Sequence, residues 1–133
     1  MLSSAAAKAL SFPDQVRLGD PTLGPALQQV SFRVARAVFE SDAAMALAFG
    51  VDRSNMARWK AGAPLSPAHA NRLQAFDVVV SLLLGFLAPT TIPKWLRGVN
   101  AHLNNRCPID VLLTGRLSEV VAAIENERSG AFA

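Results

Sequence analysis

Residues 92–115 carry start and stop signals for two short helices, and they constrain the fold more than any other stretch of the chain. Pro93 suits a first helical turn, where its missing N–H costs no hydrogen bond. Apolar residues then recur at helical spacing. They predict one apolar face made of Ile92, Trp95, Leu96, Val99 and Leu103. This helix should end near residues 104–105, two asparagines that tolerate turn geometry.

Pro108 opens the second of these helices, and Asp110 lies in its first turn beside the positive end of the helix dipole. Apolar residues at 109, 112 and 113 give this helix a side to bury. Gly115 follows as the residue that stops it. Two short helices with separate caps predict a helical packing unit rather than a sheet.

Residues 41–62 carry the second set of signals. Ser41 or Asp42 can cap a helix over 43–49, Gly50 ends it, and Asp52 or Arg53 starts another helix that runs to Lys60. A short helix, a glycine turn and a second short helix form the helix-turn-helix arrangement.

The second helix of this pair has a candidate DNA-binding face. Val51, Met56 and Trp59 should point inward, which leaves five polar residues outside or at the end: Arg53, Ser54, Asn55, Arg58 and Lys60. An asparagine can read an adenine edge and an arginine can read guanine, while serine and lysine meet phosphate. The alternative is a three-helix packing unit whose basic face is only solvated.

Two further helices are expected on either side of this pair. One spans residues 25–39, and the other runs from Pro67, behind Ser66 as its N-cap, to about Phe86. The second half of the longer helix is apolar on nearly all sides, so it lies either between two halves of the chain or on a self-association surface. We hypothesise a homodimer through Val78–Phe86. The apolar stretch at 78–88 is shorter than the roughly 18–20 residues of a membrane-spanning helix.

Both ends of the chain differ from its middle. Residues 1–24 are broken by prolines and glycines, and we interpret them as a flexible arm. Residues 116–128 predict a last helix, followed by a short tail at 129–133. Phe132 in that tail either folds back onto its own domain or docks into a partner.

The residues that enzymes need do not form a pattern in this sequence. The single cysteine, Cys107, excludes an internal disulfide and a cysteine-based zinc site, which fits a reducing interior. His69 and His102 are far apart, and no secretory signal appears. We therefore expect a cytoplasmic protein that is not an enzyme, with no catalytic residue, no metal and no cofactor.

The pattern at 92–124 resembles the toxin-binding domain of Xre/MbcA/ParS-type antitoxins, the antitoxin halves of RES–Xre toxin–antitoxin pairs. The resemblance rests on Trp95-Leu96, Asn100, Leu103, Arg106, Pro108, Asp110, Leu113, Gly115, Val120-Val121 and Ile124. Residues 46–62, with Trp59 near their end, look like the Xre/Cro version of the helix-turn-helix. The resemblance implies an all-α chain with a helix-turn-helix region at 25–88, including the long connecting helix, and a toxin-binding domain at 89–133.

What the resemblance implies in function is an antitoxin. Its partners would be operator DNA and a cognate RES-domain toxin that consumes NAD⁺ or transfers ADP-ribose from it. The implied toxin-binding residues are Trp95, Asn100, Arg106, Asp110, Arg128, Gly130, Ala131 and Phe132. Two competing interpretations are a free-standing transcriptional regulator whose C-terminal half only dimerises, and a scaffold with no DNA role.

Overall fold

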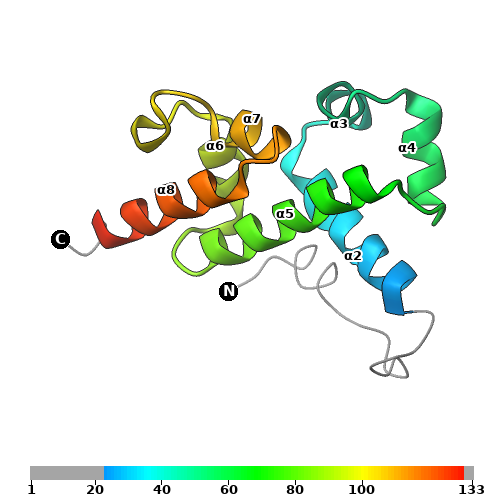
Figure 1. Cartoon of the computed structure of the whole chain (residues 1–133), viewed down its shortest axis with the longest axis horizontal. Coiled ribbons are helices and arrows are strands. Elements are labelled where there is room, and N and C mark those ends of the chain that lie inside the picture. Colours follow the sequence, from blue (N-terminus) through cyan, green and yellow to red (C-terminus); the bar gives the residue numbers. More distant parts are fainter. Residues whose placement is uncertain (1–22, 131–133) are drawn as a thin grey trace.

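The structure, a computed structural model, describes residues 23–130, and the regular structure of this part of the chain is helical (Figure 1). The prediction of an all-α fold is confirmed. The α-helices are α2 (Leu23–Val38), α3 (Asp42–Phe49), α4 (Arg53–Lys60), α5 (Pro67–Leu84), α6 (Ile92–Arg97), α7 (Pro108–Leu113) and α8 (Leu117–Gly130). Two 3₁₀ turns, η1 (Pro89–Thr91) and η2 (Ala101–Leu103), precede and follow α6.

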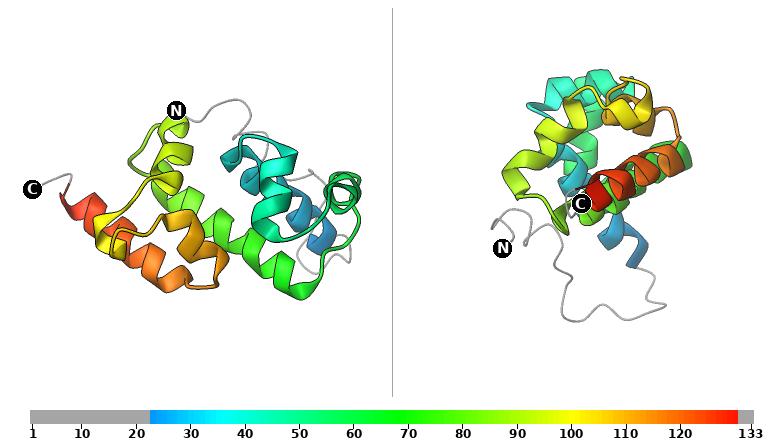
Figure 2. Two further views of the ribbon diagram at one scale, coloured as in Figure 1. Left: turned by 90° about the horizontal axis from the view of Figure 1, so that it is seen from above. Right: turned by 90° about the vertical axis from the view of Figure 1, so that its left-hand side faces the viewer.

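Helix α5 runs through the middle of the molecule. One end of it lies beside α2, α3 and α4, and the other end lies beside α6, α7 and α8 (Figures 1 and 2). It packs against α2 in the first group and against all three helices of the second. The structure therefore shows α5 in the central position, between the two halves of the chain. Val79 and Leu83 are fully buried, whereas Val78 keeps 43% of its surface exposed.

Helices α3 and α4 begin and end at the residues that the sequence signals indicate. Ser41, one of the two possible caps, accepts a hydrogen bond from the Ala44 N–H at 3.0 Å. Gly50 adopts the left-handed conformation, with φ +68°, that ends α3. The chain then turns within two residues, and the Asp52 carboxylate caps α4 by accepting from the Asn55 N–H at 2.9 Å. Because both caps are made by side chains, the pair of helices is defined by local sequence.

An aromatic cluster joins α2, α3, α4 and the first half of α5. Phe49 lies at its centre, with ring centroids 6.1 Å from Phe39, 6.2 Å from Trp59 and 6.0 Å from Phe76. Phe32 packs edge-on against Trp59 at 6.4 Å. Aromatic pairs at these separations contribute beyond the apolar area that they bury. The cluster fixes the back of α4 and so determines which of its faces meets solvent.

The segment after α6 differs from the sequence prediction. We expected one helix from Pro93 to about residue 103, but α6 ends at Arg97 and Gly98 is extended. Val99, assigned to the apolar face, is 69% exposed. Asn100 is buried instead, and it forms an isolated β-bridge with Arg106 that closes a tight turn. Helical spacing continued through this segment, but the backbone bonds of the bridge replaced those of a helix.

The last helix is also longer than predicted. Helix α8 includes Ser129 and Gly130, which we had assigned to the tail. Gly115, with φ +85°, ends α7 as expected, and the Arg116 N–H donates to the Val111 carbonyl across that turn. The predicted arm at 1–24 lies outside the described residues except for its last two, which belong to α2, and the tail at 131–133 lies outside them entirely. Within residues 23–130, no helix is both long and apolar enough to span a bilayer.

Candidate nucleic-acid interface

Helix α4 presents one face to the core and the other to solvent. Met56 and Trp59 are 1% and 7% exposed, and they pack into the core of the N-terminal half. Residues 53, 54, 57 and 58 are exposed, and Asn55 is half-buried. The predicted division of this helix into an inner apolar face and an outer polar face is therefore confirmed.

The two predicted base-reading residues of α4 lie together. The Arg58 guanidinium donates a hydrogen bond to the Asn55 side-chain carbonyl, one helical turn away. This contact uses the Asn55 carbonyl oxygen and one guanidinium N–H, and it leaves the Asn55 amide N–H groups and the other guanidinium N–H groups available as donors. Ser54 is engaged by the cap instead, since its hydroxyl donates to Asp52 at 2.6 Å. Arg53 lies at the start of the exposed face.

Lys60, expected to meet phosphate, has an intramolecular partner. Its ammonium group pairs with one oxygen of Asp42, while the Arg36 Nε lies 2.5 Å from the other oxygen. The hydrogen bond from Lys60, and then that from Arg36, hold the pKa of Asp42 below its ordinary value. The carboxylate therefore stays charged at neutral pH, and it joins α2, α3 and α4 at one point.

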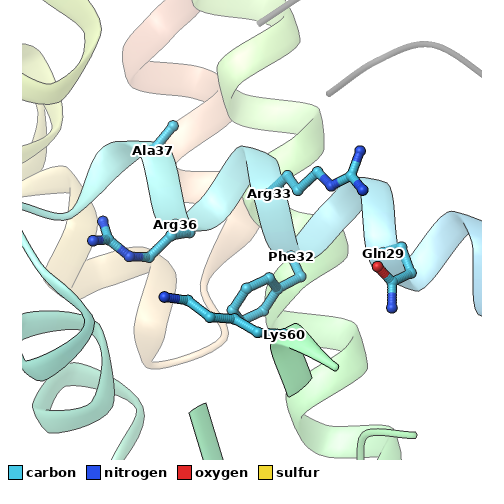
Figure 3. A pocket seen from close by; sticks show the side chains of 6 residues that line it. All are labelled: Gln29, Phe32, Arg33, Arg36, Ala37 and Lys60. Atoms are coloured by element: carbon cyan, nitrogen blue, oxygen red, sulfur yellow. The ribbon is translucent and has the colours of Figure 1, made fainter. Parts of the chain in front are cut away.

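Two adjoining hollows lie around this ion pair. The first, of about 340 Å³, is lined by α2 residues and Lys60, and Figure 3 shows the Arg36 and Lys60 side chains pointing in the same direction, whereas Arg33 points away from them. The second, of about 530 Å³, lies between α3 and α4 and includes Asp42, Arg53 and Lys60. Arg36 and Lys60 line both hollows, so the basic surface of α4 continues onto α2.

Sequence reasoning missed Arg36 and Asp42 as parts of this surface. Arg36 was given no role in the prediction, and Asp42 only that of a possible helix cap. One signal was available, because Asp42 is the first acidic residue of α3 and follows an arginine six positions earlier. That signal does not extend to Lys60, which lies 18 positions further along the chain.

The predicted toxin-binding residues of the C-terminal half fall into two groups. Asn100 and Arg106 build the turn after α6: the Asn100 N–H donates to the Arg106 carbonyl at 3.1 Å, and the Arg106 Nε donates to the Leu103 carbonyl at 2.8 Å. Trp95 is half-buried against the core. These three residues therefore make contacts within the chain itself. The others that the structure describes are exposed, namely Asp110 on α7 and Arg128 and Gly130 on α8.

The remaining chemistry-bearing residues do not converge. His69 packs between Trp59, at 5.2 Å, and Phe49, at 6.1 Å, and burial lowers its pKa, with a smaller contribution from Arg72. His102 is exposed on η2, 3.8 Å from Glu127, and Cys107 is half-buried before α7. Among residues 23–130, no three histidine, cysteine or acidic side chains gather as metal ligands would. Ala131 and Phe132 lie outside the described residues.

Comparison of the chain with protein families, with curated proteins and with solved structures finds no match. The site therefore has to be interpreted from its own residues and geometry.

Proposed function

We propose that the chain is a DNA-binding antitoxin of the Xre/MbcA/ParS type. The observation that carries this proposal is α4 itself, a capped helix that is fixed from behind by Met56 and Trp59 and exposes a basic face. A helix held in this way can enter a major groove without reorganising. No catalytic role is proposed, and the function assigned to the chain is binding.

On DNA, Asn55 and Arg58 would contact base edges, while Arg53, Ser54 and Lys60 would contact the backbone. The hydrogen bond that Arg58 donates to the Asn55 side-chain carbonyl supports this assignment, because it orders both side chains before DNA arrives and so reduces the entropy lost on binding. Binding of this kind would let the chain repress its own operon.

The C-terminal half would bind the toxin. The turn that Asn100 and Arg106 close, together with α7 and α8, forms a rigid platform, and residues 130–132 at its end would reach the active-site cleft of a RES-domain toxin. An apolar anchor such as Phe132 fills a pocket without needing charged chemistry. The toxin would be an enzyme that consumes NAD⁺ or transfers ADP-ribose from it. The assignment of this half rests on the sequence resemblance.

Electrophoretic mobility shift with the operator upstream of the gene tests the DNA part. Asn55→Ala and Arg58→Ala should each weaken operator binding by about 1–3 kcal/mol, the range for a side chain that reads a base. Arg116→Ala, which removes an exposed arginine at the start of the C-terminal α8 region, is the matched control and should bind as the wild type does. Equal binding by all three variants would remove α4 from the interface.

Growth rescue on co-expression with a RES-domain protein encoded next to this gene tests the toxin part. The wild type should restore growth, and removal of residues 131–133 should abolish rescue while leaving α8 and the fold intact. Operator binding without any rescue would instead favour a free-standing regulator. Rescue that survives the deletion would exclude the tail from neutralisation.

Self-association through residues 78–86 is part of the proposal. Val78 is the large apolar residue that this helix leaves exposed, while its neighbours Val79 and Leu83 are buried within the chain. Light scattering should show a dimer at micromolar concentration that Val78→Lys weakens. A clean monomer for the wild type would remove the dimer from the proposal.

A further inference from the structure

The hollow between α3 and α4 brings three cations from separate parts of the chain to one region. Arg36 comes from α2, and Arg53 and Lys60 come from the two ends of α4. One carboxylate, Asp42, lies among them. Three positive charges and one negative charge leave a local excess of two, which favours an anionic occupant.

Asp42 lies where such an anion would bind. Its two oxygens are taken by Arg36 and Lys60, one each. The three side chains remain 30%, 39% and 48% exposed for Arg36, Asp42 and Lys60 respectively. Ion pairs at this exposure contribute little to stability, since water and salt screen them. A multivalent anion can therefore replace the carboxylate at small cost.

The hollow has room for a phosphate group. Its volume is about 530 Å³, and the residues between the charged groups are small, namely Ser41, Ala43 and Ala57. Small side chains let a nucleic-acid backbone approach the two helices closely. Arg53 and Lys60 also belong to the exposed face of α4, so one ligand can touch both surfaces without bending.

We propose that this hollow is a binding site for a backbone phosphate of duplex DNA, and that Asp42 occupies the phosphate position in the free protein as an internal competitor. The inference rests on the proposed DNA contact of α4 and extends it to α2 and α3. Because Asp42 competes with phosphates of any sequence, it lowers the affinity for non-specific and for operator DNA alike, whereas base contacts from α4 are unaffected. Asp42 thus sets the overall strength of DNA binding, and the preference for the operator stays with the base contacts of α4.

Fluorescence anisotropy with a labelled duplex of mixed sequence, titrated at several KCl concentrations, tests the inference. Asp42→Asn should tighten binding several-fold and make the slope of log affinity against log salt steeper by about one, the change expected for one more phosphate contact. Arg36→Gln should weaken binding and make the slope shallower. Glu125→Gln is the matched control, because it removes the same charge from an exposed position on α8 and should leave the slope unchanged.

The outcomes separate this inference from the proposed function. If the wild type binds neither its operator nor mixed-sequence duplex, the proposed DNA contact of α4 is wrong, and so is the proposed phosphate site. If Arg58→Ala weakens operator binding but Asp42→Asn behaves like Glu125→Gln, the phosphate site is wrong and the DNA contact of α4 stands. Weaker duplex binding by Asp42→Asn would mean that the carboxylate orients the cations rather than competing.

Two controls keep the test decisive. Thermal unfolding checks that each variant folds. If Asp42→Asn does not fold, Asp42→Ser replaces it, because serine is well suited to the start of a helix. Poly-glutamate added at equal charge concentration should displace the duplex poorly. If it displaces the duplex as well as unlabelled DNA does, the hollow recognises carboxylates and the choice of phosphate is overturned.

Discussion

Asp77 places a carboxyl group at the packed interface between α5 and α2. One oxygen accepts a hydrogen bond from the hydroxyl of Ser31, which is 5% exposed. The other oxygen is buried and has no partner among the described residues. Burial raises the pKa of Asp77 above its ordinary value, and the Ser31 hydrogen bond offsets only part of that rise. The charged form of this residue therefore costs stability in the folded protein.

Asp77→Asn should stabilise the protein at pH 7. The folded state holds the Asp77 proton more tightly than the unfolded chain does, so the wild type loses stability as pH rises from the ordinary aspartate pKa through the raised one. Asparagine does not titrate and escapes this loss. We expect a gain on the order of 1 kcal/mol at pH 7, limited by solvent screening of this partly exposed site, that shrinks as the pH falls towards 4.

Urea unfolding at pH 4 and at pH 7 measures this difference. Glu125→Gln provides the baseline for a carboxylate on the surface of α8. A constant difference between Asp77→Asn and the wild type at both pH values would show that burial of the charge is not its cause.

At this scale the sequence predicts which residues are apolar and inward, but it does not predict their partners. Met56 and Trp59 were expected in the core because helical spacing alone places them there. The pairing of Asp42 with Lys60 was not expected, because it depends on how α3 and α4 cross. Phe32 was missed for the same reason, since it packs against Trp59 of another helix.

Among the elements, the pair α3 and α4 depends most directly on local chemistry. Gly50 is the residue on which the turn depends, because it alone in that turn adopts a positive φ. A Cβ built at Gly50 meets nothing within 4 Å, so sterics with other residues do not restrict the site. Only the backbone conformation selects glycine here.

Gly50→Ala should therefore destabilise the protein by about 1 kcal/mol, the cost of a left-handed conformation for a residue with a Cβ. Gly50→Asn should cost less, because asparagine tolerates that region better. Chemical denaturation of the two variants measures the difference. Equal losses would indicate that the turn rearranges rather than keeping its backbone conformation.

The turn after α6 shows why local signals failed elsewhere. Residues 99–103 keep helical apolar spacing, yet the backbone of Asn100 bonds across to Arg106. Asn104 and Asn105 both have positive φ and allow the chain to reverse there. The asparagines were correctly interpreted as a turn. The pairing across that turn could not be foreseen, because apolar periodicity contains no information about hydrogen bonds between the two sides of a turn.

The molecule as a whole is held together by α5. Phe76 and Leu83, two turns apart on α5, both belong to one hydrophobic core that includes residues of both halves. An ion pair of 2.6 Å between Arg97 on α6 and Glu40 after α2 also links the halves. The sequence predicted two regions with a boundary near 88, but it left the role of the long helix open.

Because α5 is common to both halves, we expect them to unfold together. The chain has two tryptophans, Trp59 in the first half and Trp95 in the second, so Trp95→Phe and Trp59→Phe each leave one fluorescent reporter. Leu83→Ala, added to either variant, should lower the free energy of unfolding by about 2–5 kcal/mol through the cavity that it leaves. Both reporters should record the same loss. If Leu83→Ala shifts the unfolding transition reported by Trp95 but not the one reported by Trp59, the two halves are independent units.

The shared helix also sets a limit on modular engineering. A graft of the basic face of α4 onto another protein, or of the last three helices onto another helical domain, must place a junction between residues 62 and 92. Every such junction leaves one half with a helix whose buried side chains were matched to the half that was removed. Neither half of this chain can therefore be transferred unchanged. A working chimera would need residues 73–83 redesigned to pack against the helices of both halves at once.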